Sequence, residues 1–176
     1  VAGATSLTAY VRKEEIWTAL RARIAADPTN PTPPLELAEI ALRSGDVDDA
    51  LKGLDEAMRR ARATTNVEDA ATMRRLFEAS LNFAETLSRQ SRLTAPILEL
   101  LQEYAAETCA DRTSAVVYRL RFGNMLEGFS DPGRALALYQ QILRDRSLRE
   151  LNVNDSNSPA EQLAGSIATN RIAKLI

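Results

Sequence analysis

The chain has 176 residues, 45% of them hydrophobic, so it can bury a core and is not a disordered polypeptide. Its 22 basic and 24 acidic residues give a net charge of −2, which excludes a general electrostatic attraction to nucleic acid. No apolar run reaches the roughly 18 residues of a membrane-spanning helix, so no membrane span is expected.

The first predicted helix covers residues 7–26, with Ser6 or Thr8 as its cap. Its apolar stripe includes Trp17, which we expect to anchor the helix on a neighbour rather than to bind a ligand. Because the chain starts at Val1 rather than at methionine, we expect a mature protein or an excised domain, and both cytoplasmic and exported locations stay open. The pattern is still apolar at Leu175 and Ile176, which suggests that the protein continues beyond this end or that the end packs on something.

Residues 31–63 give the clearest pattern, which predicts two short amphipathic helices joined by a tight turn. Prolines 33 and 34 suit the first turn of a helix, with Thr32 as its N-cap. Gly45 suits the left-handed position at the end of that helix, and Asp46 suits the cap of the next one.

Residues 66–109 predict a longer pair of helices. Alignment with the clear hairpins places Asn82 and Glu99 at core positions, where polar side chains are unfavourable. We therefore interpret this segment as a degenerate, extended hairpin of the same stack. A packed three-helix element that interrupts the stack is the alternative.

Residues 113–147 predict a second clear hairpin, which begins at Thr113 or Ser114 and has Asp131 as the cap of its second helix. Residues 152–157 read as a loop. The sequence Ser158-Pro159-Ala160-Glu161 then predicts a capping box and a trailing helix over residues 158–176.

The two clear hairpins share one spacing of small and large residues. The first hairpin contains Pro34-x₂-Leu37-Ala38-x₂-Ala41 followed by Ala50-x₃-Leu54-x₂-Ala57, and the second contains Arg119-x₂-Phe122-Gly123-x₂-Leu126 followed by Ala135-x₃-Tyr139-x₂-Ile142. From Leu37 to Ala50 and from Phe122 to Ala135 the separation is 13 residues in both cases. This spacing resembles the tetratricopeptide repeat, whose pattern is W-x₂-L-G-x₂-Y and then A-x₃-F over about 34 residues.

The resemblance implies an all-α fold in which antiparallel helical hairpins stack as a short right-handed solenoid of about eight helices. It also implies a single domain over residues 1–176 and a non-catalytic scaffold that binds a peptide or helix of a partner protein in a concave groove. The groove candidates that follow from the repeat positions are Leu35, Glu39, Leu42, Arg43, Phe77, Ser80, Val117, Leu120, Arg121, Asn124 and Glu127. A branch of the family that clamps a C-terminal carboxylate has Lys and Asn where Leu35 and Glu39 stand, so we do not expect such a clamp.

An alternative function is that of a structural unit that self-associates through its terminal helices. That alternative predicts a homo-oligomer whose contact contains Trp17, Ile172, Leu175 and Ile176.

Catalytic chemistry has little support in the sequence. The chain lacks histidine, which is the usual general base near neutral pH and the commonest metal ligand, so we expect no enzyme activity, metal or cofactor. The only cysteine, Cys109, has no histidine to activate it and is expected to be a buried thiol at a helix end. The arginines at positions 59, 60, 62, 74 and 75 suggest an anion site, but we favour a solvated basic helix end.

Overall fold

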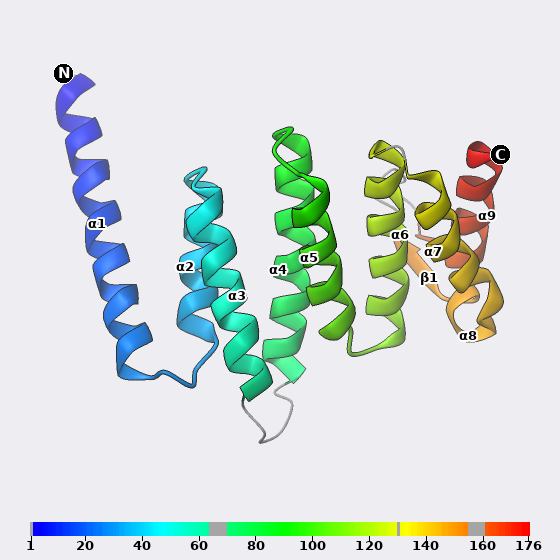
Figure 1. The fold of residues 1–176 in the computed structure, drawn as a ribbon, viewed down its shortest axis with the longest axis horizontal. Helices are drawn as coiled ribbons and strands as arrows, with labels where there is room; N and C mark the ends of the chain where they lie inside the picture. The colour runs from blue at the N-terminus through cyan, green and yellow to red at the C-terminus, as the bar shows by residue number, and fades with distance from the viewer. Residues whose placement is uncertain (1, 64–69, 130, 155–160) are drawn as a thin grey trace. The chain divides into compact units, whose positions relative to one another are not determined.

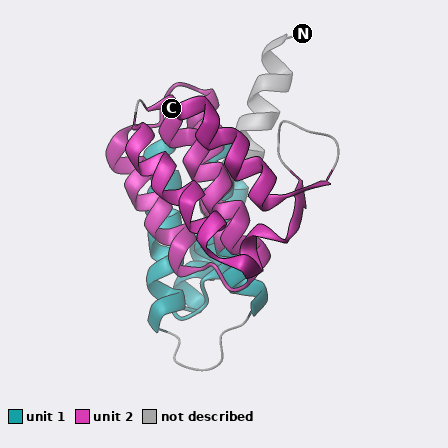
Figure 2. Cartoon of the chain, turned by 90° about the vertical axis from the view of Figure 1, so that its right-hand side faces the viewer, with its two compact units in different colours: residues 1–76 teal, residues 77–176 magenta. Residues whose placement is uncertain are grey.

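The computed structural model describes residues 2–63, 70–129, 131–154 and 161–176, and of residues 2–13 it describes the backbone alone. Most of the described residues are helical (Figure 1), which confirms the all-α prediction. The chain forms two compact units, residues 1–76 and residues 77–176 (Figure 2), and each is described by itself. None of the described helices is long and apolar enough to cross a membrane. The single domain and the right-handed sense of the stack stay predictions.

The first unit contains helices α1 (Ala2–Ala26), α2 (Thr32–Arg43), α3 (Val47–Ala63) and the first turns of α4 (Ala70–Arg89). Helix α1 packs against α2, and α2 pairs with α3 over the residues where the sequence predicts a hairpin (Figure 1). Helix α1 begins at Ala2, before the predicted start, since the alanines of its first turn are compatible with a helix. Ser6 and Thr8 therefore lie inside the helix, and the prediction that one of them caps it is wrong.

The turn between α2 and α3 has the predicted chemistry. Gly45 adopts a positive φ of 79°, and the Asp46 carboxylate accepts a hydrogen bond from the Asp49 N–H at 3.3 Å. The predicted cap of α2 is wrong, because the helix already begins at Thr32. The carboxamide oxygen of Asn30 instead accepts a hydrogen bond from the Thr32 N–H at 2.9 Å.

The second unit contains the rest of α4, then α5 (Ala95–Glu107), α6 (Arg112–Gly128), α7 (Pro132–Arg144), α8 (Arg146–Arg149) and α9 (Ala164–Leu175). Helices α6 and α7 pair with each other and α7 packs against α9. Both Asn82 and Glu99 are exposed, so the alignment that places them in a core is wrong, and the buried face of α5 consists of Leu98, Leu101, Tyr104 and Ala105.

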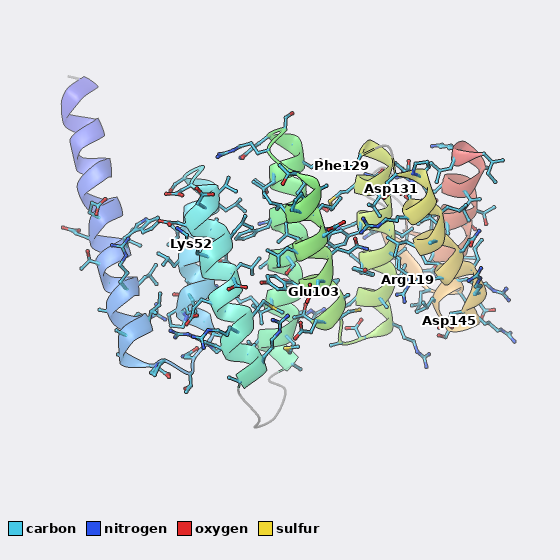
Figure 3. The ribbon with its side chains drawn as sticks, in the orientation of Figure 1. Lys52, Glu103, Arg119, Phe129, Asp131 and Asp145 are labelled. Carbon is cyan, nitrogen blue, oxygen red and sulfur yellow. The ribbon has the colours of Figure 1, made fainter. Side chains whose placement is uncertain are left out.

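Aspartates cap three helices of this unit. Asp111 accepts a hydrogen bond from the Ser114 N–H at 2.7 Å, so α6 begins before the predicted start at Thr113 or Ser114. The predicted cap of α7 is confirmed, since Asp131 accepts from the Arg134 N–H at 3.1 Å. Asp145 caps the short helix α8, which is additional to the eight expected helices (Figure 3).

Two short strands stand where the sequence predicts a loop and a helix start. Strand β1 (Asn152–Asn154) pairs in antiparallel fashion with β2 (Glu161–Leu163), and Val153 is buried. Residues 158–160 of the predicted capping box lie outside the described residues, but Glu161 belongs to β2, so α9 begins at Ala164 rather than at position 158. A three-residue strand contains too little alternation for the sequence to reveal it.

A glycine permits close packing of the helices in each clear hairpin. A Cβ atom at Gly53 of α3 would lie 2.9 Å from Cβ of Ala38 in α2. In the second hairpin, a Cβ atom at Gly123 of α6 would lie 2.5 Å from the ring of Tyr139 in α7. Tyr139 is fully buried and donates its hydroxyl hydrogen bond to the Glu127 carboxylate. In the repeat, Gly123 stands at the position of Ala38, and Tyr139 stands at the position of Leu54. The second hairpin therefore combines the larger tyrosine with the smaller glycine.

We expect Gly123→Ala to destabilise the protein by about 1–3 kcal/mol, because the added methyl group overpacks the Tyr139 ring. Urea unfolding measures the effect. The control is Gly128→Ala at the end of the same helix, where a Cβ meets no atom within 4 Å; helix propensity should stabilise that variant by up to about 1 kcal/mol. Adding Tyr139→Leu should reduce the cost of Gly123→Ala, since the pair then matches Ala38 and Leu54. A Gly123→Ala protein as stable as the parent would contradict this account of the packing.

Candidate functional site

Five of the eleven predicted groove residues are buried, and four of these five line neither of the two openings described below. Leu35 is 1% exposed, Leu42 3%, Phe77 5% and Ser80 0%. Their side chains contribute to packing rather than to an open surface. The other predicted residues are at least partly exposed, except Leu120, which is 9% exposed and forms the floor of a cleft described below.

In the first unit, Glu39 and Arg43 lie along an open groove between α1 and α2, which we call the α1 groove. Its volume is about 340 Å³, and its lining residues are Ile16, Ala19, Leu20, Arg23, Glu36, Glu39, Ile40 and Arg43. The groove is mainly apolar, and Ile16 is 48% exposed within it. An ion pair of 2.6 Å between Arg23 and Glu36 crosses from α1 to α2.

In the second unit, four predicted residues come together in a cleft of about 400 Å³, which we call the α6 cleft. Helix α6 contributes the predicted Val117, Leu120, Arg121 and Asn124 together with Met125. The other lining residues are Glu85, Ser88 and Arg89 from α4, Asn154 from β1, and Ile167 and Arg171 from α9. The floor is apolar, since Leu120, Met125 and Ile167 are all buried.

Helical periodicity explains why α6 presents these residues together. Positions 117, 121 and 124 are separated by four and three residues, so they lie on one face of the helix. The opposite face carries Phe122 and Leu126, which are buried at 0% and 1% exposure. The helix therefore offers one stripe to the hairpin core and another to the cleft.

Three arginines and one carboxylate line the α6 cleft. Arg121 forms an ion pair with Glu85 at 3.0 Å. Arg171 donates a hydrogen bond to the Asn124 carboxamide oxygen at 2.8 Å and lies 4.0 Å from a carboxylate oxygen of Glu127. The predicted residue Glu127 thus lies beside the cleft, where it joins Arg171 of α9 to Tyr139 of α7.

Arg89 differs from the other two arginines of the cleft. Its Nε donates a hydrogen bond to the Glu85 carbonyl oxygen at 3.3 Å, which fixes the side chain against its own helix. Within the described part of the chain, no carboxylate forms an ion pair with its guanidinium group. Since Glu85 compensates Arg121 and Glu127 compensates Arg171, Arg89 accounts for the excess positive charge that the described residues give the cleft.

Repeat spacing identifies only the α6 side of this cleft. Residues Glu85 and Arg89 of α4 lie in the segment that departs from the repeat pattern, and Ile167 and Arg171 lie in the predicted trailing helix. In the α1 groove, Ile16 and Ile40 belong to ordinary apolar stripes, and nothing in the local sequence separates them from core residues.

The arginine cluster near the end of α3 has a structural role. Arg60 is 5% exposed, and its Nη1 atom donates hydrogen bonds to the carbonyl oxygens of Asp27 at 2.8 Å and Asn30 at 3.1 Å. Both Nη1 and Nη2 also lie 3.4 Å from the Ile24 carbonyl oxygen, and Nε pairs with Glu56 at 2.7 Å. The interpretation of Arg60 as part of a solvated basic end is therefore wrong. This side chain ties α3 to the end of α1 and to the connection before α2.

Two further arginines of that cluster, Arg59 and Arg75, point to different carboxylates. Arg59 pairs with Glu56 on the exposed side of α3, and Arg75 pairs with Glu39 of α2 at 3.3 Å. Their donors are thus directed at carboxylates of the same unit, which disfavours a site for an external anion.

Cys109 lies two residues beyond the end of α5 and is partly buried, with its Sγ atom 3.8 Å from the Asp111 carbonyl oxygen. Burial raises the pKa of its thiol. A raised pKa lowers the fraction of thiolate, which is the nucleophilic form. This environment does not favour a catalytic cysteine.

Comparison with known proteins gives one family. A family model described as tetratricopeptide repeat matches residues 11–94, a range that contains the α2–α3 hairpin. The resemblance inferred from the spacing of the hairpins is thereby confirmed for this range. The chain has no match among curated proteins or among solved structures.

We expect Arg60→Met to destabilise the protein by about 3–5 kcal/mol, because it removes the partner of three backbone carbonyls and of a partly buried carboxylate. The matched control is Arg59→Met, which removes an exposed partner of the same carboxylate and should cost much less stability. Urea unfolding of both variants provides the comparison. Equal losses of stability would show that Arg60 acts only as a surface charge.

The carboxylate of Glu56 predicts a specific pH dependence. Hydrogen bonds from Arg59 and then Arg60 lower the pKa of Glu56 to about 2, whereas an unfolded chain has an ordinary glutamate pKa of about 4.3. The folded state therefore binds fewer protons, so this contribution is complete above about pH 5 and is lost as the pH falls toward about 2. The stability difference between the parent and Glu56→Gln should shrink over that range, as measured by urea unfolding at several pH values. A difference that stays constant with pH would contradict the lowered pKa.

Proposed function

Because residues 11–94 carry a tetratricopeptide repeat, we propose that this chain is a non-catalytic module that binds a segment of a partner protein in the α6 cleft. Tetratricopeptide repeats generally mediate protein–protein interactions, and modules of this family are typically non-catalytic. The observation that carries the proposal is the meeting of Val117, Leu120, Arg121 and Asn124 in one open cleft.

The composition of the cleft supports a peptide ligand. Its floor is apolar, and its rim carries Ser88, Asn124 and Asn154, whose side chains can hydrogen-bond to a peptide backbone. Val117 is partly exposed, so an apolar side chain of a partner can bury additional surface against it. Such a combination of apolar floor and polar rim is typical of peptide-binding surfaces.

Self-association through the terminal helices is the alternative. Trp17 is 7% exposed and so offers little surface to a second copy, whereas Ile176 is 95% exposed. Light scattering over a wide concentration range distinguishes the two functions. A monomer at all concentrations favours the binding module, and an oligomer that dissociates on Ile176→Asp favours self-association.

The binding test uses a library of random dodecapeptides held between two fixed flanking sequences. We expect Val117→Gln to weaken selected peptides by at least about fivefold, because it removes about 1 kcal/mol of apolar contact. The matched control is Leu143→Gln, a partly exposed apolar residue of α7 that does not line the cleft. Circular dichroism verifies that both variants are folded. If no peptide is selected, or if the two substitutions weaken binding equally, the cleft is not the binding site.

A further inference from the structure

Among the described residues, Arg89 is the arginine of the α6 cleft that no carboxylate pairs with, and it indicates which partner segment fits. The geometry points to an extended segment that presents an Asp or Glu side chain next to a large apolar one, with the carboxylate on Arg89 and the apolar side chain on the floor at Val117 and Leu120. This inference rests on the proposed function, because it names the chemistry of the ligand for the same cleft.

The charge of the cleft accounts for the preference for an acidic side chain. The ion pair of Arg121 with Glu85 and the contacts of Arg171 with Asn124 and Glu127 already occupy two of the three cationic groups. Arg89 uses Nε to bind the Glu85 carbonyl oxygen, so its terminal amino groups can donate to a partner. A carboxylate matches the planar guanidinium group and forms charge-assisted hydrogen bonds that are stronger than those of a neutral amide.

The end of α4 does not cancel this preference. Carbonyl groups at the C-terminal end of a helix carry partial negative charge and would oppose an anion. Here the Leu87 carbonyl oxygen accepts hydrogen bonds from the N–H groups of Arg92 and Leu93, and the Thr86 carbonyl oxygen accepts one from Gln90. The carbonyl groups of Thr86 and Leu87 are therefore hydrogen-bonded, and a full positive charge on Arg89 outweighs the remaining partial charge of the helix end.

The size of the cleft limits how much of the segment can enter it. The cleft measures about 400 Å³, which is near the lower end of the range of about 300–1,000 Å³ for small-molecule sites. That volume accommodates one or two side chains, so only a short part of the segment enters the cleft. An extended segment can place one apolar side chain into the floor and its acidic neighbour at the rim, because successive side chains point in different directions.

The experiment continues from peptides selected on the intact chain of 176 residues. The best peptide is synthesised with an acetylated N-terminus and an amidated C-terminus, so its only carboxylates are side chains. Fluorescence anisotropy then measures its affinity for the parent and for Arg89→Gln. We expect a loss of about tenfold on Arg89→Gln, and the same loss when the acidic residue of the peptide is replaced by its amide. Combining both changes should add little more, because they remove one interaction. Binding of the acidic peptide should also weaken at high salt.

Arg144→Gln is the matched control, because Arg144 is likewise an exposed arginine in the last turn of a helix and does not line the cleft. It should leave peptide affinity unchanged. Selected peptides that lack acidic residues but still respond to Val117→Gln would overturn this inference and leave the proposed function intact. Selected peptides whose affinity does not change on Val117→Gln would overturn the proposed function itself. A selection that yields no binding peptide would do the same. An acidic peptide that binds Arg89→Gln as tightly as the parent would also overturn the assignment of Arg89.

Discussion

The close approach of paired helices is the constraint on which the rest of the structure depends. In each clear hairpin the two helices approach so closely that a Cβ atom on the glycine would clash, at Gly53 against Ala38 and at Gly123 against Tyr139. This contact uses one stripe of each helix for packing. On α6 it leaves Val117, Arg121 and Asn124 on another stripe, which is the one that lines the cleft. The glycine contact therefore helps to determine which residues are available to a partner.

The hairpins could be predicted from sequence because their signals are local. Gly45 and Asp46 determine the first turn through backbone conformation and capping, and Asp131 with Pro132 begins α7 in the same way. The strand pair of residues 152–154 and 161–163 could not be predicted, since Val153 is its one buried residue and a single position shows no alternation. Arg60 was missed for a different reason. Its backbone acceptors lie 30 to 36 residues earlier in the chain, so its neighbours in sequence do not reveal them.

The candidate site was predictable to a similar extent. Repeat spacing alone predicts Leu120, Arg121 and Asn124 as groove residues, because they share one helix face. It also predicts Leu35 and Leu42 as groove residues, which occupy comparable positions on α2 but are buried. Spacing within one helix cannot distinguish these outcomes, since exposure depends on which elements cover the face. The opposite wall of the cleft, with Arg89 and Arg171, comes from α4 and α9, and only tertiary packing brings these helices to α6.

The choice of arginine has a consequence for how the cleft would respond to its surroundings. The chain has no histidine, so no imidazole changes its charge near neutral pH. The cations of the α6 cleft are all arginines, and the guanidinium group is not deprotonated in proteins. The positive charge of the cleft is therefore constant over the physiological range of pH. What can change is the screening of that charge, because the rim of the cleft is open to solvent and the Debye length at physiological ionic strength is about 8 Å. A partner bound through Arg89 would accordingly be released by salt or by loss of its own carboxylate, rather than by a change in the protonation of this chain.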